Sequence, residues 1–218
     1  MTDRLFGRTR VAFLWRLCAV SEEVKEKETT SVSEVIKRAA ESARGAGVLG
    51  SSTFCLCLVD TVRGTAQVAH LGDSGVLIVG KEGVVKLKTP QQEHSFGFPF
   101  QLGHHDRSDR PEDALVSVVS VEAGDVIVVG SDGLFDNLSD AEVAACAIEG
   151  RRGGGRGTKA DAGAMAAAIA NELGRRAFEN SLDKKIATPY SIAATEAFSM
   201  IYSGGKSDDI TIVVACIV

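Results

Sequence analysis

The stretch VIVVGSDGLFDNL, residues 126 to 138, decides how this chain is interpreted. Its first five residues are apolar or small, which predicts a buried strand. The strand runs straight into Ser131, Asp132 and Gly133, and a second acid follows at Asp136. A carboxylate at the tip of a buried strand needs a partner, because burying an unpaired charge is costly.

Two other acidic segments lie at predicted strand boundaries. Asp73 follows a strand that ends at Leu71, and Asp208 and Asp209 precede the last strand. If these strands are neighbours, their carboxylates meet at one edge, where a hard divalent cation with oxygen ligands would relieve the repulsion. Mg²⁺ or Mn²⁺ fits this donor set, and zinc does not. Taken singly, each acid is also explained as an ordinary turn residue.

The rest of the chain predicts an α+β fold with consecutive antiparallel strands and interspersed helices. Strands are expected at 52–60, 65–71, 75–80, 84–88, 115–121, 125–130 and 211–218. Capping residues and helical periodicity predict helices that begin near Ser31, Ser139 and Thr188, and an alanine-rich helix that ends at Gly174. The glycine- and arginine-rich segment 150–159 is expected to be a flexible surface loop.

Composition narrows the class of protein. The 218 residues are 44% hydrophobic and 24% charged, which predicts one domain over residues 1–218. A formal net charge of -5 gives no support for nucleic-acid binding. Five scattered cysteines indicate a reduced, intracellular protein. The apolar stretch near the N-terminus is interrupted by Arg16, so no membrane span is expected, and residues 1–20 are interpreted as an amphipathic helix.

Several motifs together resemble the protein phosphatase 2C family of metal-dependent serine/threonine phosphatases. These are GSST (50–53), AHLGDSG (69–75), GDVIVVGSDGLFDNL (124–138) and GGKSDDITIVVA (204–215), in this order. PQQEHSFGFPFQL (90–102) and TPYSIAATEAF (188–198) resemble the organelle-associated subgroup. The resemblance covers about residues 5 to 218. It implies a four-layer α-β-β-α sandwich of antiparallel sheets flanked by helices, with two Mg²⁺ or Mn²⁺ ions and sometimes a third.

The resemblance also implies a reaction and its residues. Metal-activated water would hydrolyse phosphoserine or phosphothreonine in a phosphoprotein substrate. Asp132 and Asp208 match metal ligands, Asp73 matches the acid of a further, weaker metal site, and Gly133 and Asp209 are supporting residues. No catalytic residue is assigned beyond the metal ligands. The subgroup resemblance implies the mitochondrion or plastid as the compartment, and a monomer without a nucleic-acid partner is expected.

One departure from the family pattern bears on activity. The DGxGG motif, whose Asp bridges both metals, is absent, so the chain resembles a domain without its first strands. Since that Asp fixes the metal spacing that positions the attacking water, we expect weak or no hydrolysis by this chain alone. The alternative function is a phosphatase-like module, impaired in catalysis, that binds partners or phosphoproteins.

A serine hydrolase is a third possible class of protein. The sequence GDSG would make Ser74 the nucleophile and His70, on the preceding strand, its base. The chain has neither a G-x-S-x-G elbow nor a disulfide framework, so this interpretation is rejected.

Overall fold

The computed structural model describes residues 31–47, 49–152 and 159–218. The helix expected within residues 1–20 lies outside these ranges. The chain divides into two compact units, which are described separately. Of the described residues, the first unit contains those up to 58 together with 67–73 and 92–118, and the second contains those in 59–66, 74–91 and 119–218.

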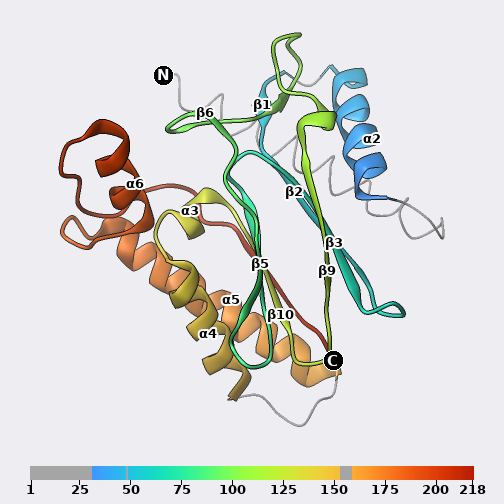
Figure 1. The fold of residues 1–218 in the computed structure, drawn as a ribbon, viewed down its shortest axis with the longest axis vertical. Helices are drawn as coiled ribbons and strands as arrows, with labels where there is room; N and C mark the ends of the chain where they lie inside the picture. The colour runs from blue at the N-terminus through green and yellow to red at the C-terminus, as the bar shows by residue number, and fades with distance from the viewer. Residues whose placement is uncertain (1–30, 48, 153–158) are drawn as a thin grey trace. The chain divides into compact units, whose positions relative to one another are not determined.

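The first unit is built around helix α2 (Val32–Gly45). The Oγ of Ser31 caps α2 by accepting a hydrogen bond from the Glu34 backbone N–H, as the sequence predicted. The apolar face of α2 joins one buried cluster: Val32, Ile36, Ala40, Ala43, Phe54, Ala69, Leu71 and Leu102. Burial of this face therefore anchors α2 to the strands of its own unit (Figure 1).

The strands of the first unit form one sheet and two short pairs. The sheet has the order β2 (Phe54–Asp60), β3 (Thr65–Leu71), β9 (Leu115–Ser120), and the ends of these strands belong to the second unit. The short pairs are β1 (Ser51–Ser52) with β8 (Leu102–Gly103), and β6 (Glu93–Ser95) with β7 (Phe98–Pro99). A 3₁₀ turn, η1 (Pro111–Asp113), precedes β9.

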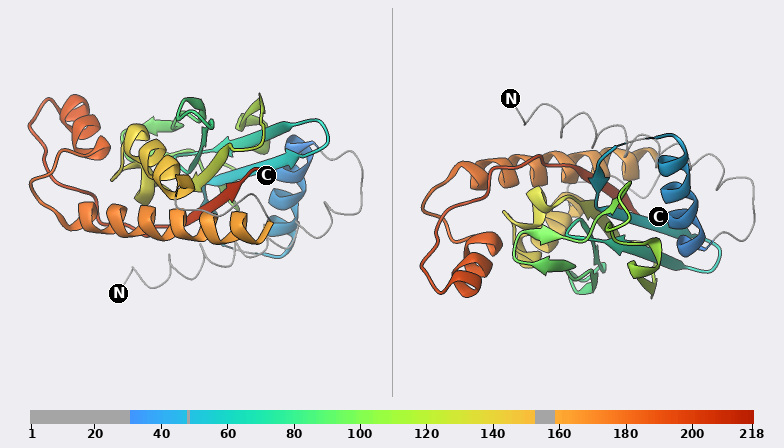
Figure 2. Two further views of the ribbon diagram at one scale, coloured as in Figure 1. Left: turned by 90° about the horizontal axis from the view of Figure 1, so that it is seen from below. Right: turned by 90° about the horizontal axis from the view of Figure 1, so that it is seen from above.

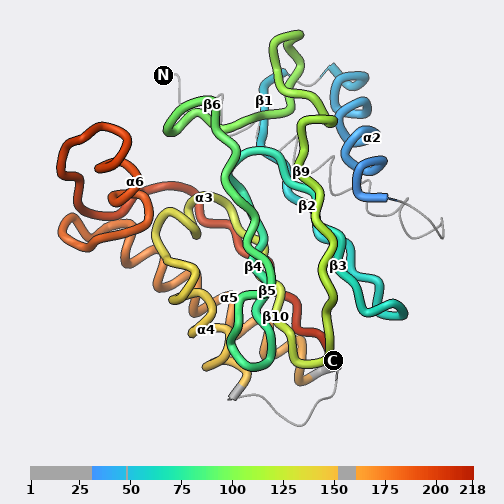
Figure 3. The backbone as a smooth tube through the Cα atoms, viewed as in Figure 1, coloured from blue at the N-terminus to red at the C-terminus, as the bar shows by residue number. Residues whose placement is uncertain are grey.

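The second unit is a four-stranded antiparallel sheet with helices on one face. Its strand order is β11 (Ile212–Cys216), β10 (Val126–Gly130), β4 (Gly75–Val79), β5 (Val85–Lys88). β10 pairs with both β4 and β11 along its whole length. Figure 3 follows the backbone through the β4–β5 hairpin. β10 is thus a central strand, and the residues before and after it lie at opposite ends of the sheet.

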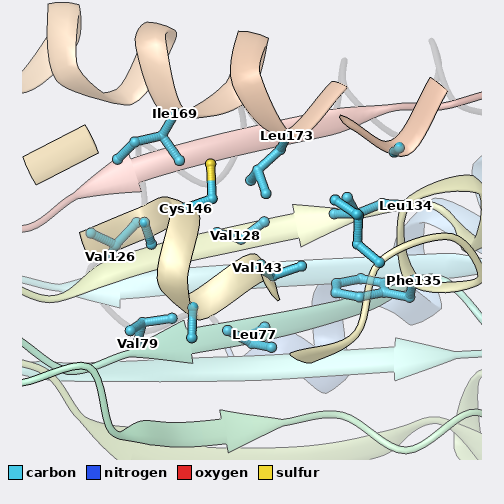
Figure 4. Close-up of a cluster of buried hydrophobic side chains, with 14 residues drawn as sticks. Leu77, Val79, Val126, Val128, Leu134, Phe135, Val143, Cys146, Ile169 and Leu173 are labelled. Carbon is cyan, nitrogen blue, oxygen red and sulfur yellow. The ribbon is translucent and has the colours of Figure 1, made fainter. Parts of the chain in front are cut away.

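Two helices cover this sheet: α4 (Asp140–Arg152) and α5 (Lys159–Leu182). Figure 2 shows α5 running beside β11, and Figure 4 shows the buried side chains that pack between the helices and the strands. The buried cluster combines strand residues such as Leu77 and Val128 with helix residues such as Val143, Ile169 and Leu173. This core fixes the sheet and therefore the loops at its ends.

Two shorter helices complete the second unit. α3 (Asp132–Phe135) follows β10 directly, and α6 (Pro189–Phe198) lies between α5 and β11 in the sequence. The Thr188 side chain caps α6 as predicted, and the capping pair Ser139 and Glu142 begins α4. Within the described residues, no helix is both long and apolar enough to cross a membrane.

The predicted α+β class with antiparallel strands is confirmed, with three corrections. The strands were expected to pair consecutively, but β3 and β4 belong to different sheets, and the chain turns at Gly72 with a positive φ of 101°. α5 does not end at Gly174, because buried Leu173 and Ala177 and the surrounding Glu–Arg pairs continue the helix. The loop 150–159 is shorter than expected, since α4 reaches Arg152 and α5 begins at Lys159, while 153–158 lie outside the described residues.

Candidate metal centre

The C-terminal end of β10 is joined to the segment before β11 by hydrogen bonds of Ser131. Its backbone N–H donates to the Thr211 carbonyl at 3.0 Å, and its Oγ donates to the Asp209 carbonyl at 2.9 Å. The Thr211 N–H in turn donates to Ser131 Oγ at 3.0 Å. These bonds bring the two acidic segments of the sequence, 131–136 and 208–209, to the same end of one sheet.

Glycine at 133 permits this close approach. A Cβ at Gly133 would lie 2.5 Å from the carbonyl oxygen of Asp209, which is closer than any side chain tolerates. The supporting role predicted for Gly133 and Asp209 thus has a structural basis in the backbone. The Asp209 side chain itself is exposed.

Lys206 lies at the point where three carboxylates converge. Its Nζ is 2.7 Å from Oδ2 of Asp132, 2.7 Å from Oδ2 of Asp136 and 3.4 Å from Oδ2 of Asp208. The exposed fractions of the three acidic side chains are 22%, 12% and 27%. Three carboxylates around one ammonium leave a formal surplus of two negative charges in a partly buried cluster, which we call the Lys206 cluster.

The second oxygen of each carboxylate is held by a different donor. Oδ1 of Asp132 accepts from the Gly133 N–H at 3.0 Å, and Oδ1 of Asp208 accepts from the Asp209 N–H at 2.8 Å. Oδ1 of Asp136 receives a longer contact, 3.5 Å, from the Gln91 side chain. The carboxylates of Asp132 and Asp208 are therefore oriented by the next backbone N–H group, and all three acids turn Oδ2 towards one shared cation.

Asn137 holds the backbone of residue 206 in place. Its buried side chain donates to the carbonyls of Gly133 and Lys206, both at 2.9 Å, and accepts from the Lys206 N–H at 3.0 Å. Gly205 beside it has no room for a Cβ, which would collide with the Asn180 carbonyl. The loop is thus positioned by its backbone, independently of where the Lys206 side chain points.

The electrostatics of the cluster follow from burial and mutual charge. Burial raises the pKa of Asp136, and the Lys206 charge offsets only part of that increase. Burial by itself would lower the pKa of Lys206, but the charges and hydrogen bonds of Asp136 and Asp132 outweigh it and raise the pKa. Burial also works against ionisation of Asp208, but the Asp209 N–H and Lys206 outweigh it and lower its pKa. Ionisation of the acids in the cluster therefore depends on a positive charge close to them.

The structure brings together two of the three acids that were predicted as metal ligands. Asp132 and Asp208 meet at Lys206, whereas Asp73 belongs to the first unit, so its part in the site remains a prediction. Neither Asp136 nor Lys206 was predicted as part of the site. The sequence contained a signal for Lys206. Residues 206 and 208 are two apart, so in an extended segment their side chains can face the same side.

The carboxylate oxygens of the Lys206 cluster are of the kind that bind a hard divalent cation, but they are not arranged around a metal position. Carboxylate oxygens are what Mg²⁺ and Mn²⁺ bind, and three of them converge here. Over residues 31–47, 49–152 and 159–218, however, no group of three or more His, Cys, Asp or Glu side chains is placed to hold a metal ion directly. The three Oδ2 atoms surround an ammonium group instead.

Comparison with known proteins identifies the family. The family model described as Stage II sporulation protein E (SpoIIE) matches residues 12–218, which is nearly the whole chain. Two curated relatives that are 38% identical over 76% of this chain are named as phosphatases of the 2C type. The chain belongs to the protein phosphatase 2C family. The resemblance seen in its motifs is thereby confirmed.

The relatives are longer than this chain. "Probable protein phosphatase 2C 80" of Arabidopsis thaliana is 38% identical over 166 residues, which are 76% of this chain and 37% of the relative. "Protein phosphatase PTC7 homolog fig" of Drosophila grimshawi is 34% identical over 178 residues, which are 78% of this chain and 55% of the relative. The chain thus spans about a third to a half of these phosphatase 2C proteins.

Solved structures confirm the fold. The photosystem II phosphatase PBCP is 28% identical and superposes with a TM-score of 0.77 over 98% of this chain and 79% of its own. The catalytic domain of the serine/threonine phosphatase PstP, solved with two manganese ions, is 15% identical with a TM-score of 0.59 over 95% of this chain and 81% of its own. At that identity, the PstP domain supports the phosphatase 2C fold alone.

Proposed function

We propose that this chain is a metal-dependent protein serine/threonine phosphatase domain that hydrolyses phosphoserine and phosphothreonine in a phosphoprotein. The observation that carries the proposal is the convergence of the Oδ2 atoms of Asp132, Asp136 and Asp208 on one cation position at the end of β10. Family membership supports the reaction type. The convergence supports Asp132 and Asp208 as the residues that hold the metal.

Each residue of the centre has a definable task. A divalent cation, when bound, supplies a water of lowered pKa and neutralises charge on the phosphoryl group. Asp132 and Asp208 would bind the ion, and the N–H groups of Gly133 and Asp209 hold those carboxylates in orientation. Ser131 keeps the two segments together. Asp73 is proposed as a ligand of a further ion.

The choice of metal, the partner and the compartment follow from the donors and the relatives. A carboxylate-only donor set favours Mg²⁺ or Mn²⁺, and the manganese ions of PstP agree with this choice. The phosphatase names of the relatives support a phosphoprotein substrate. The likeness to a photosystem II phosphatase supports the plastid half of the proposed mitochondrial or plastid location.

A second function is favoured by a specific observation. Lys206 already balances part of the charge of the acids, so the described fold needs no metal to hold them together. A chain in this state would keep its fold without a metal-activated water, as expected of the alternative function, an interaction module that binds partners or phosphoproteins without turnover.

Phosphate release from a phosphothreonine peptide, measured with the purified chain in Mn²⁺, separates the two functions. We expect slow release by the wild type that falls to background in Asp132→Asn. Asp140→Asn is the matched control, because Asp140 follows the same segment but pairs with Lys88 and not with Lys206. Binding of the peptide without any Mn²⁺-dependent release would contradict the phosphatase proposal and favour the interaction module.

A further inference from the structure

The Lys206 ammonium lies among the acids that would hold a metal, so it affects how a metal can bind there. Its Nζ contacts Oδ2 of Asp132 and Asp136 at 2.7 Å each and lies 3.4 Å from Oδ2 of Asp208. These are the oxygens that are not committed to local N–H donors. A divalent ion that uses them needs oxygen distances of about 2.0–2.2 Å for Mg²⁺ or Mn²⁺. The ammonium and the ion would then share the same oxygens at close range, where their charges repel.

We propose that Lys206 is a tethered counter-cation that occupies the metal position in the metal-free chain and must be displaced before a divalent ion binds. This inference rests on the proposed metal site. It assigns to Lys206 control over how much divalent cation the chain needs. The lysine holds the acids together without metal and competes with the metal for them.

Displacement of the side chain is compatible with the way the loop is built. The backbone of residue 206 is held on both sides by the Asn137 side chain, so the loop stays in place when the ammonium leaves. Lys206 has 29% of its side chain exposed, and the ring of Tyr190 lies 5.6 Å from Nζ. An alternative position for the ammonium beside that ring would retain part of its stabilisation.

The same sheet offers a matched lysine. Lys86, at the other end, is 2.7 Å from the buried Asp125 and 3.2 Å from the exposed Glu122. Its side chain is 26% exposed, close to the 29% of Lys206. Substitution of either lysine removes one positive charge from the second unit, but only Lys206 contacts the acids proposed to bind metal. Lys86→Met therefore controls for the general effect of charge.

The experiment measures Mn²⁺ binding by calorimetry and thermal unfolding in EDTA and in Mn²⁺, using the full chain. We expect Lys206→Met to bind Mn²⁺ about tenfold more tightly than the wild type or better, because the competing charge is gone. In EDTA its Tm should be lower than that of the wild type, and Mn²⁺ should restore it. Lys206→Arg should keep the weaker affinity of the wild type, and Lys86→Met should lose stability that Mn²⁺ does not restore.

The outcomes separate the two proposals. Equal Mn²⁺ affinity in wild type and Lys206→Met, or weaker binding by the variant, overturns the competition and leaves the metal site standing. Absence of Mn²⁺ binding in both overturns the metal site and the competition together. If Lys206→Met unfolds in EDTA, Lys206→Gln is tested as well. Folding of these variants in Mn²⁺ supports the proposal, and failure to fold even in Mn²⁺ overturns it, because the ammonium would then be irreplaceable.

Discussion

The two ends of strand β10 carry two lysine-centred acidic clusters that are built differently. At the N-terminal end, Asp125 is fully buried, its Oδ2 accepts from Lys86 and from the Glu122 N–H, and its backbone pairs with Ile217. At the C-terminal end, Lys206 contacts three acids, all of them partly exposed. The first has two acids around its lysine, one of them fully buried, and the second has three, so the formal surplus of negative charge is larger at the C-terminal end.

The difference indicates which end can bind a ligand. At the N-terminal end, the full burial of Asp125 gives a further cation no access, although its Oδ1 has no hydrogen-bond partner within the described residues. Three acids that share one ammonium gain from a second positive charge, and partial exposure gives an ion access. Ammonium and carboxylate groups thus stabilise the fold at one end of β10 and form a candidate metal centre at the other.

Removal of the buried acid should have the largest effect on stability. Asp125→Ala leaves Lys86 without its closest partner and the Glu122 N–H without its acceptor. We expect the free energy of unfolding to fall by about 3 kcal/mol, as for a broken buried pair. Urea unfolding measures this. Mn²⁺ affinity should not change, and a parallel loss of Mn²⁺ binding would show that the two ends are not independent.

Removal of the amide that fixes the Lys206 loop should have an intermediate effect. Asn137→Ala deletes three hydrogen bonds in a buried setting, two to residue 206 and one to Gly133. We expect a loss of about 2 kcal/mol in the free energy of unfolding and weaker Mn²⁺ binding. Asn180→Ala is the control, because it removes one bond to the Asn137 carbonyl and leaves the loop contacts intact. Equal losses in both variants would argue against a special role for the Asn137 side chain.

Ion pairs on the surface of α5 should have the smallest effect. Glu172 pairs with Arg175 and Arg176, whose hydrogen bonds and charges lower the pKa of Glu172 to about 2. A carboxyl group with a lowered pKa stabilises the fold above its ordinary pKa of 4.5, and this contribution disappears as the pH falls towards 2. Glu172→Gln should lower Tm slightly at pH 7, less at pH 3, and not below about pH 2.

A salt series distinguishes this surface network from the Lys206 cluster. The Tm difference between wild type and Glu172→Gln should shrink in high salt, because exposed pairs are screened. The difference between wild type and Lys206→Met in EDTA should be less sensitive, since that cluster is partly buried. If both differences respond equally to salt, the Lys206 cluster is screened like a surface pair despite its partial burial.

Much of the fold was predictable because its signals are local. Alternation of apolar residues and turn glycines located the strands, and the capping residues Ser31, Ser139 and Thr188 located the starts of three helices. The wrong end of the alanine-rich helix shows the limit of local signals. Gly174 is a common helix terminator, but packing of Leu173 and Ala177 and the pairs of Arg175 and Arg176 override it.

The strands, the acids at their ends and the family can be recognised from the chain alone, because the motifs around Asp132 and Asp208 are contiguous. That Asp136 joins these two acids, and that Lys206 lies among all three, follows only from the folded structure. Residues 132 and 206 are far apart in sequence, and their contact depends on the pairing of β10 with β11 and on the bonds of Ser131 and Asn137. Convergence of charges is a property of how strands pair, which local sequence patterns do not encode.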